Sequence, residues 1–545
     1  MQNYLEDHGD YIEVYFRYDS VLVERIKSVA GRSYSPKKRC WKIPFSSKSI
    51  EGLNKVISDY SFYIPESLRD KMSNTVEKAE IMYDLSASLG IDSLDIAGLS
   101  GKLRPFQKSG VLYALQAIKN CGGCIIGDEM GLGKTVEAIA VLQSLNNFPA
   151  LIVCPATLKL NWKNEISKWL PQRTVDIWNG KNNADILIIN YESLYKYRVE
   201  LKNKEFKAIV FDECHYIKNK DSQRFKASRF IVEQIPVKLF LSGTVILNRP
   251  KELLTVLMLL NILPKLGVKD SWNYLVKYCD GKQTIYGWNF DGASNTKELN
   301  TVLRSTCYIR RLKTNVLSEL PEKQRVVVPF NISKKDANLI KEDIKNVIGK
   351  YKEAKEYKKN EEASLPGLIS QIERIKQAVV EFKFDGIIEW IENFLESGEK
   401  LVVFAHHIDF VQRIAQRFNA QYLDGTTTTE HRQKAVEDFQ NNPNTKLLVL
   451  GIKVGGVGIT LTAASNVAFV ELGWNPAEML QAEDRLHRIG QKNAVTAWYL
   501  LAENSIEEAI FNLIERKRGV VDAVLDGKTE ESTENIVYKL IEQFK

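Results

Sequence analysis

Short runs of consecutive apolar residues alternate with stretches of helical spacing from about Gly101 onward. They form two series, Ala150–Cys154, Ile186–Ile189, Ala208–Phe211 and Val237–Leu241, and later Leu401–Phe404, Gln421–Leu423, Lys446–Leu450, Val467–Val470 and Val495–Leu500. Continuous apolar runs between helices are typical of parallel strands that are buried on both faces. The pattern therefore predicts an α/β chain with two parallel-sheet lobes.

The remaining stretches show other patterns. Residues 1–65 contain an alternating, aromatic-rich run, Tyr11–Phe16, followed by apolar residues at helical spacing, and predict a small α+β domain. Residues 66–100 predict a helical linker. Residues 250–385 predict mostly helix, with a charged section from Lys350 to Glu362 expected as a solvated helix or loop.

The stretch Gly127–Thr135, GDEMGLGKT, lies between an apolar run and a helical pattern. Gly131 and Gly133 allow the backbone N–H groups to curl around an anion, a role that strand-loop-helix turns often take. Lys134 is expected to reach the β- and γ-phosphates of ATP, and Thr135 to ligate Mg²⁺. The match to the phosphate-loop pattern is incomplete because Asp128 holds the position of the first glycine. A glycine-rich helix entry without a ligand is the alternative.

Two adjacent carboxylates, Asp212 and Glu213, follow the apolar run Ala208–Phe211 in the sequence DECH. We expect Asp212 to hold Mg²⁺ and Glu213 to orient and deprotonate the water that attacks the γ-phosphate. A helix N-cap with a favourable acidic residue is the alternative.

Near the C-terminus, the stretch QAEDRLHRIGQ places Arg485 and Arg488 three residues apart. On one face of a helix, both arginines could enter one cleft and stabilise the charge that develops during phosphoryl transfer. A surface arginine pair is the alternative, but it does not explain the flanking Gln481, Gly490 and Gln491.

A basic segment lies between residues 31 and 50. It contains six Lys and Arg residues, among them Lys37, Lys38 and Arg39, and it contains no acidic residue. Tyr34 and Trp41 are interleaved with the basic residues. Cations beside exposed rings suit single-stranded or branched nucleic acid. A solvated basic hairpin with Trp41 in the core is the alternative. The net charge of +7 is too small to decide the matter.

Seven cysteines are scattered singly except for Cys121 and Cys124. A lone C-x-x-C pair lacks the other ligands of a zinc site, so reduced thiols are expected. The N-terminus is polar and no apolar run approaches the ~20 residues needed to span a bilayer. We therefore expect no membrane partner and a location in the cytoplasm, with a bacterial or viral origin favoured, or in the nucleus of a eukaryote.

The ordered set GDEMGLGKT, DECH, Ser242-Gly243-Thr244, Gly455-Gly456-Val457-Gly458 and QAEDRLHRIGQ resembles the motifs of superfamily 2 helicases in their Swi/Snf form. The likeness implies two RecA-like lobes and the cofactors ATP and Mg²⁺. It places Arg104, Gln107, Asp128, Gly458 and Gln481 in the ATP site, with Gln107 reading the adenine. It also implies DNA contacts by Pro155, Thr157, Asn190, Lys453 and Trp474.

A narrower likeness is to the HepA-related, annealing-helicase branch. It rests on Phe404-Ala405-His406-His407 and Glu471-Leu472-Gly473-Trp474-Asn475-Pro476, while the stretch around Lys38-Arg39-Cys40-Trp41 resembles the HARP domain of that branch. The resulting division is 1–65 HARP-like DNA-binding domain, 66–100 linker, 101–250 RecA-like lobe 1, 251–385 helical insertion, 386–505 RecA-like lobe 2 and 506–545 C-terminal helical brace.

These features predict a DNA-dependent ATPase that translocates on duplex or branched DNA and supports fork remodelling, strand annealing and DNA repair. Catalysis is expected from Lys134, Asp212, Glu213, Arg485 and Arg488. An ATPase that strips proteins from DNA is the alternative within enzymes, and a non-enzymatic DNA-binding scaffold is the alternative outside them. The sequence names no protein partner.

Overall fold

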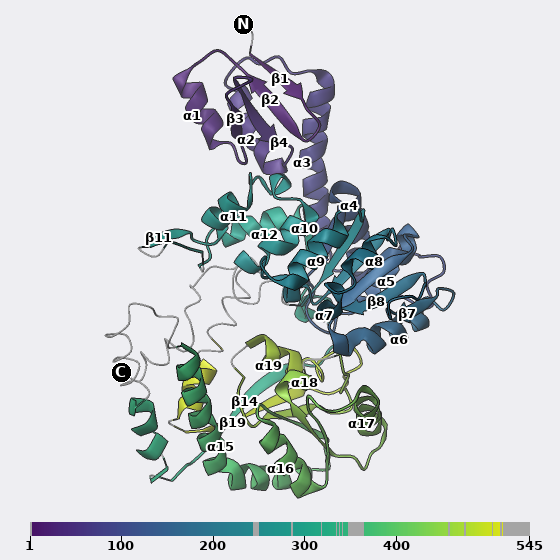
Figure 1. The fold of residues 1–545 in the computed structure, drawn as a ribbon, viewed down its shortest axis with the longest axis vertical. Helices are drawn as coiled ribbons and strands as arrows, with labels where there is room; N and C mark the ends of the chain where they lie inside the picture. The colour runs from purple at the N-terminus through teal and green to yellow at the C-terminus, as the bar shows by residue number, and fades with distance from the viewer. Residues whose placement is uncertain are drawn as a thin grey trace. The chain divides into compact units, whose positions relative to one another are not determined.

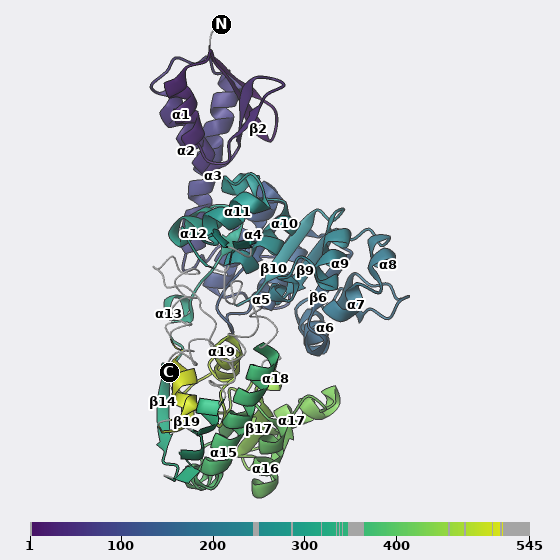
Figure 2. The ribbon, with the colours of Figure 1, turned by 60° about the vertical axis from the view of Figure 1, so that its left-hand side comes forward.

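The computed structural model describes residues 3–243, 250–284, 287–290, 292–317, 319–333, 335–336, 338–340, 342–346, 365–455, 458–473, 476–503, 505–512 and 515. The chain divides into two compact units, the first ending at Val316 and the second beginning at Leu317. Figures 1 and 2 show the helices and strands of both units from two directions.

The first unit begins with a small α+β domain. Its antiparallel sheet has the order β1-β2-β4-β3, and α1 and α2 cover the sheet with a core that includes Ile12, Val14 and Ile43. The elements are β1 Tyr4–Asp7, β2 Tyr11–Tyr15, α1 Ser20–Ser28, β3 Ser33–Ser35, β4 Cys40–Pro44 and α2 Ser47–Ile57. The predicted α+β fold of this region is confirmed. A long helix, α3 (Glu66–Ala87), follows it.

A seven-stranded parallel sheet forms the rest of the first unit, in the order β13-β5-β10-β9-β6-β8-β7. The strands are β5 Gly123–Ile126, β6 Ala150–Cys154, β7 Val175–Ile177, β8 Ile186–Asn190, β9 Ala208–Asp212, β10 Val237–Leu241 and β13 Tyr308–Ile309. The apolar runs of the first predicted series are strands buried on both faces, since the two sides of the sheet carry separate hydrophobic cores. The helices of this sheet are α4 Pro105–Cys121, α5 Lys134–Leu145, α6 Lys159–Trp169, α7 Tyr191–Leu194, α8 Arg198–Lys202 and α9 Gln223–Val232.

The second unit contains a six-stranded parallel sheet in the order β14-β19-β18-β15-β17-β16. Its strands are β14 Lys323–Phe330, β15 Leu401–Ala405, β16 Gln421–Leu423, β17 Leu447–Gly451, β18 Asn466–Phe469 and β19 Val495–Ala502. Its helices are α15 Leu365–Leu395, α16 Ile408–Phe418, α17 Thr429–Asn441, α18 Ile452–Gly455 and α19 Pro476–Glu483. The second predicted strand series and the two-lobe α/β fold are confirmed.

The region expected as one helical insertion, residues 251–385, is shared between the units. It supplies α10 Leu254–Leu260, α11 Ser271–Tyr278, the hairpin β11 Lys282–Thr284 and β12 Gly287–Asn289, α12 Thr296–Arg304 and α13 Lys313–Val316. It also supplies β13 to the first sheet and β14 to the second, while α15 continues past residue 385. The strand β13 is too short to predict, and β14 is only partly buried, so neither has the continuous apolar signature.

Some expectations fall on other parts of the chain. The charged section 350–362 lies outside the described residues, and so does most of the expected C-terminal brace, 506–545. Within the described part of the chain, no helix is both long enough and apolar enough to span a membrane.

Candidate active site

Three strands bring three of the predicted motifs to one edge of the first sheet. β10 pairs with β5 on one side and with β9 on the other, and the register aligns Leu241 with both Ile126 and Asp212. Because all three strands are parallel, the residues that follow them emerge side by side. The sheet therefore places the start of the phosphate loop, Ser242 and the DECH carboxylates next to one another.

The phosphate loop has the backbone that its glycines predict. Gly131 and Gly133 have φ angles of 83° and 91°, in the left-handed region that favours glycine. A Cβ atom on Gly133 would lie 2.5 Å from Nε2 of Gln107, so a side chain at this position would displace the amide of Gln107. Thr135 lies in the first turn of α5, directly after Lys134.

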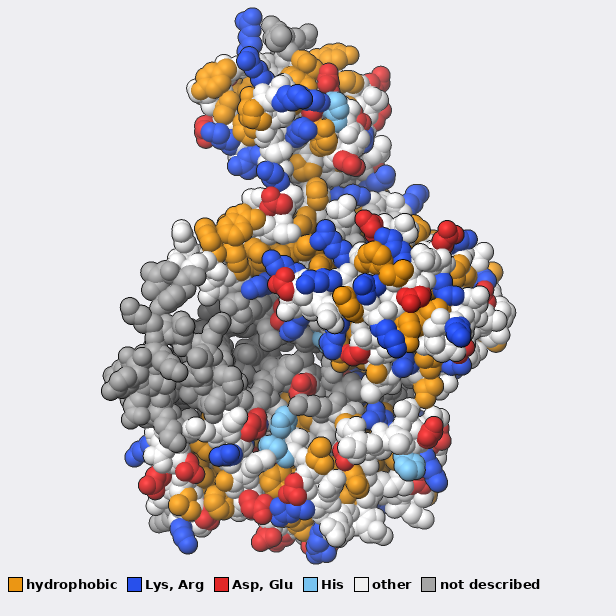
Figure 3. Space-filling view, in the orientation of Figure 1, with side chains coloured by type: hydrophobic (Ala, Val, Ile, Leu, Met, Phe, Trp, Pro, Cys, Tyr) orange, Lys and Arg blue, Asp and Glu red, His pale blue; other side chains and the backbone are white. Residues whose placement is uncertain are grey.

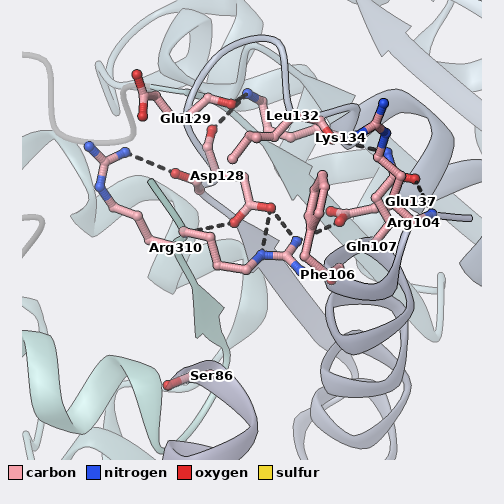
Figure 4. A network of polar contacts seen from close by, with 12 residues as sticks. Ser86, Arg104, Phe106, Gln107, Asp128, Glu129, Leu132, Lys134, Glu137 and Arg310 are labelled. Carbon is pink, nitrogen blue, oxygen red and sulfur yellow. Dashed lines mark hydrogen bonds and ion pairs between the residues drawn. The ribbon is translucent and has the colours of Figure 1, made fainter. Parts of the chain in front are cut away.

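Lys134 turns inward over its own loop. Its Nζ donates to the backbone oxygen of Asp128 at 2.8 Å and to that of Glu129 at 3.4 Å (Figure 4). An ammonium group held among the loop carbonyls is positioned to exchange these weak acceptors for phosphate oxygens. The loop residues therefore fit a bound nucleoside triphosphate.

Gln107 connects the start of α4 to the phosphate loop. Its Oε1 accepts from the backbone N–H of Arg104 at 2.9 Å, and its Nε2 donates to the backbone oxygen of Leu132 at 3.0 Å (Figure 4). This side chain is 6% exposed. Arg104 and Gln107 therefore lie beside the phosphate loop, and the hydrogen bond to Leu132 fixes Gln107 against it.

Asp128 is fixed by a buried ion pair. Its carboxylate is buried and accepts from the backbone N–H and the guanidinium of Arg311, which also pairs with Glu137. Burial raises the pKa of Glu137 to about 8, although Arg311 opposes the shift. Removing a buried charge partner is costly, so this network anchors the phosphate loop, and the expected ATP contact of Asp128 stays a prediction.

Arg310 and Arg311 are functional candidates that the sequence reasoning missed. The Nη1 atom of Arg310 donates to the backbone oxygens of Gly127 (3.0 Å) and Gly243 (3.2 Å), so one side chain links the phosphate loop to the loop after β10. Both arginines directly follow β13 (Tyr308–Ile309). An arginine pair after a two-residue strand carries little signal in a single sequence.

Asp212 and Glu213 occupy distinct environments. Trp162 donates its indole N–H to Oδ2 of Asp212 at 2.8 Å, and the backbone N–H of Glu213 donates to Oδ1 at 3.0 Å. Burial, reinforced by the neighbouring charge of Glu213, raises the pKa of Asp212 to about 6. Among the described residues no cation forms an ion pair with this carboxylate, so it is suited to holding a metal ion, which would offset its charge.

Glu213 has a φ of 51°, which is uncommon for a residue other than glycine and recurs at functional sites. Its Oε2 accepts from the hydroxyl of Ser242 at 3.3 Å and lies 3.3 Å from Nδ1 of His215. The two carboxylates therefore have separate hydrogen-bond partners, Trp162 for Asp212 and Ser242 for Glu213.

The segment QAEDRLHRIGQ in the second unit differs from the predicted helix. The helix α19 ends at Glu483, and Arg485 and Arg488 lie on the turns that follow, both half-buried. Arg488 donates to the backbone oxygen of Ile459 at 3.3 Å, close to Gly458, which has a φ of 59°. Gln481 is half-buried on α19.

The residues around the two arginines hold these turns in place. Glu483 is buried and accepts from Lys323 and Arg325 of β14, as well as from the hydroxyl of Tyr499. His487 contacts the backbone oxygen of Pro321, and Gln491 donates to the backbone oxygen of Ala464. The motif therefore contains two kinds of residue, those that fix the turns and the two arginines that the turns present. The hydrogen bond of Gln491 to Ala464 gives Gln491 a structural role.

The basic segment of the small α+β domain is only partly available to a ligand. Lys38 pairs with the buried carboxylate of Glu13 at 2.9 Å, while Trp41 is half-buried and lies against the ring of Tyr34. Lys37 and Arg39 are exposed, and no polar partner for either is found among the described residues. Figure 3 shows Lys and Arg side chains beside hydrophobic ones on the visible face of this domain.

The other predicted DNA contacts are spread over both units. Thr157 is exposed on the short 3-10 turn Ala156–Leu158, next to the buried Pro155. Asn190, at the end of β8, donates to Glu192 at 2.9 Å. Lys453 lies in α18, but its side chain and the whole of Trp474 are outside the described residues, as are Thr244, Gly456 and Val457.

Two family descriptions match the chain. Residues 106–380, 275 of the 545, match the SNF2-related domain, and residues 383–490 match the helicase conserved C-terminal domain. The first range includes the phosphate loop and the DECH carboxylates, and the second includes both arginines.

Curated relatives extend the match. The SWI/SNF-related matrix-associated actin-dependent regulator of chromatin subfamily A-like protein 1 homolog of Caenorhabditis elegans is 30% identical, over 95% of this chain and 75% of its own length. Its Xenopus laevis counterpart is 30% identical, over 96% of this chain and 55% of its own length. The human DNA annealing helicase and endonuclease ZRANB3 is 33% identical, over 79% of this chain and 41% of its own length.

A solved structure is also similar, the Sulfolobus solfataricus SWI2/SNF2 ATPase core in complex with dsDNA. It shares 27% identity, covers 80% of this chain and 96% of its own, and has a TM-score of 0.40. The match of the first domain to half of the chain, and the C. elegans relative matched over three quarters of its length, show that this chain belongs to the SNF2-related family.

Proposed function

We propose that this chain is an ATP-dependent DNA translocase that acts on duplex or branched DNA. The observation that carries the proposal is the alignment of the phosphate loop, Ser242 and the DECH carboxylates at one edge of the first sheet. A non-enzymatic scaffold has no use for this arrangement, in which Lys134, Asp212 and Glu213 are all intact and differently held.

In this proposal the first unit binds and cleaves ATP. Lys134 leaves the loop carbonyls for the phosphates, and the loop N–H groups around Gly131 and Gly133 hold the same anion. Thr135 and Asp212 hold Mg²⁺, which neutralises charge on the phosphates when bound. Glu213 orients the attacking water and accepts its proton. The hydrogen bond from Ser242 to Glu213 links the loop after β10 to the protonation state of Glu213.

Arg485 and Arg488 of the second unit are assigned to stabilise the charge that develops on the transferred phosphoryl group. Hydrolysis then depends on residues of both units, and ATP binding, hydrolysis and product release form one cycle. If each unit holds DNA, this cycle moves the protein along the strand. Contacts by Thr157, Asn190 and Lys453 would be mainly to phosphates and largely independent of sequence.

The small α+β domain is proposed to direct the motor to branched DNA through Lys37 and Arg39, with Tyr34 as an exposed ring beside them. The human relative is named a DNA annealing helicase, which favours strand annealing and fork remodelling in DNA repair. The other relatives are named regulators of chromatin, which favours the second candidate, an ATPase that remodels protein-DNA complexes.

The proposed compartment is where the DNA lies, the cytoplasm of a bacterium or the nucleus of a eukaryote. The curated relatives named above are animal proteins, which give no support to the preference for a bacterial or viral origin.

The test is the ATPase rate of the full chain with no DNA, single-stranded DNA, duplex and a forked substrate, beside a strand-annealing assay. We expect stimulation by DNA, strongest with the fork, and ATP-dependent annealing. Stimulation without annealing, together with displacement of a DNA-bound protein, would support the remodelling candidate. A rate unaffected by any DNA would contradict both.

A further inference from the structure

Two adjacent histidines and a glutamate meet at the carboxyl end of β15 in the second unit. His406 and His407 directly follow β15 (Leu401–Ala405), and Glu373 projects from α15 (Leu365–Leu395). Each of the three offers one ligand atom, and these atoms all lie within 4.8 Å of one another. The side chains of Glu373 and His407 are each 21% exposed, so a small ion from solvent has access. None of these residues belongs to the proposed ATP site.

A buried carboxylate holds the ring of His407 in place. Its Nδ1 lies 2.6 Å from Oε1 of Glu471, a carboxylate that is 1% exposed and also accepts the backbone N–H groups of His406 and His407. Where Glu471 accepts the Nδ1 proton, Nε2 on the other side of the ring lies 3.7 Å from Oε2 of Glu373 and is the nitrogen that can bind an ion. Metal-bound histidines typically have such a carboxylate on the other ring nitrogen.

His406 carries an unsatisfied ring nitrogen. Its Nδ1 is buried and has no hydrogen-bond partner among the residues that the structure describes, an arrangement that costs free energy in a folded protein. A ring nitrogen in this situation is suited to binding a metal ion.

Lys376 is the feature that opposes a cation. Its ammonium lies 3.2 Å from Oε2 of Glu373 and is 2% exposed. The group as a whole still favours a divalent ion, because Glu373 and Glu471 supply two negative charges against the one positive charge of Lys376. The competing interpretation is a metal-free network in which Glu373 serves only as the partner of Lys376.

We propose that His406, His407 and Glu373 form a binding site for one Zn²⁺ ion, with Glu471 positioning His407. Two imidazoles and a carboxylate match the preference of zinc, whereas Mg²⁺ and Ca²⁺ prefer oxygen ligands alone. Small shifts must draw the three ligand atoms together, and water completes the tetrahedron. The ion joins α15 to the end of β15, which pairs in register with Gly451 just before α18. The bound ion would therefore stabilise the end of the sheet next to α18, the helix that contains Lys453.

The test is Zn²⁺ binding by the full chain after chelator treatment, measured by competition with a chromophoric chelator. We expect one tight site per chain, weakened about 100-fold or more in His407→Ala and in Glu373→Gln, and about 10-fold or more in Glu471→Gln. His431→Ala is the matched control, because His431 is an exposed histidine on α17 whose side chain makes no hydrogen bond to the residues that the structure describes. Equal binding by the wild type, the control and both ligand variants would overturn the proposal.

Two further readouts separate a lost ligand from a lost fold and from binding by cysteine. Zn²⁺ is expected to raise the unfolding temperature of the wild type and of His431→Ala, but not of Glu373→Gln, whose unfolding without metal should match the wild type. Bound Co²⁺ should show visible bands without the charge-transfer absorption of thiolate ligands. A thiolate band that persists in His407→Ala would assign the metal to cysteines and contradict the proposal.

Discussion

The two sheets hold their candidate residues in different ways. In the first sheet, Lys134, Asp212 and Glu213 emerge from neighbouring strands or the loop after one, and each has a named partner in the same unit. In the second sheet, Arg485 and Arg488 lie on turns whose shape is fixed by their neighbours, above all by the buried Glu483. Under the proposed function, the first sheet binds the phosphates of ATP through residues fixed within one unit. The second sheet then supplies two cations from a segment held by its neighbours, which suits a charge that is needed only in the transition state.

The largest expected effect comes from Arg488→Ala, which tests the division between binding and hydrolysis. Loss of an arginine that acts only in the transition state should lower the DNA-stimulated ATPase rate by ~10³-fold or more and leave ATP binding within a few-fold. Rate and nucleotide affinity are measured on the same preparation. Loss of both, with a lower unfolding temperature, would instead make Arg488 a structural residue of the turns.

The next effect concerns the anchor of the phosphate loop. Arg311→Ala leaves the carboxylates of Asp128 and Glu137 buried without their cation and should reduce the free energy of unfolding of the first unit by about 3–5 kcal/mol. Denaturant unfolding measures this loss. Arg69→Ala, at an exposed position on α3, should change it by less than about 0.5 kcal/mol. Equal stability of the two variants would show that the loop does not depend on its buried network.

A smaller effect is expected from the pH dependence of Asp212. Because Asp212 must be ionised to hold Mg²⁺ and its pKa is raised to about 6 by burial, kcat/KM for ATP should fall as the pH drops through about 6. Trp162→Phe removes a hydrogen bond to the carboxylate and should move the inflection upward by about one pH unit. An inflection that stays in place would separate Asp212 from the activity.

The same shift has a consequence for stability. The pKa of Asp212 in the folded protein lies above its ordinary value of 3.8, so the folded state binds the proton more tightly than the unfolded state. The contribution of Asp212 to stability is therefore largest below about pH 4 and is lost as the pH rises to about 6. Asp212→Asn should flatten this part of the stability profile.

The smallest effect concerns the basic segment. Lys37→Ala with Arg39→Ala removes two exposed cations and should weaken binding to forked DNA several-fold, reducing the salt dependence of log K by about one per lost phosphate contact. Basal ATPase should be unchanged. Lys55→Ala, an exposed lysine of α2, is the control. An unchanged salt dependence in the double variant would leave these two cations as solvated surface residues.

Much of this structure could be predicted from local sequence patterns. Buried parallel strands are continuous apolar runs, so Ala208–Phe211 and Leu401–Phe404 could be predicted as strands. Gly131 and Gly133 were expected to let the loop curl, and both have positive φ angles. These features depend on a few neighbouring residues. The fold of each lobe could also be predicted, because strands that alternate with helices along the chain typically form a parallel sheet covered by those helices.

What the sequence concealed depends on residues distant in the chain. Arg311 lies 183 positions from Asp128, so nothing near GDEMGLGKT indicates that its aspartate is an anchor. Likewise, Trp162 looks like any core aromatic residue until β9 brings Asp212 to it. The helix expected at Arg485 ends early because Glu483 is fixed by Lys323 and Arg325, a constraint invisible in helical spacing.

The role of Glu213 as the base of a DNA-stimulated ATPase is tested most directly by the ATPase rate of Glu213→Gln with and without forked DNA, beside ATP binding by the same variant. We expect a DNA-stimulated rate lower by ~10²–10⁴-fold with ATP affinity kept within a few-fold, because the amide retains the size of the side chain but cannot accept the proton. A variant that hydrolyses ATP at the wild-type rate and still responds to DNA would contradict it.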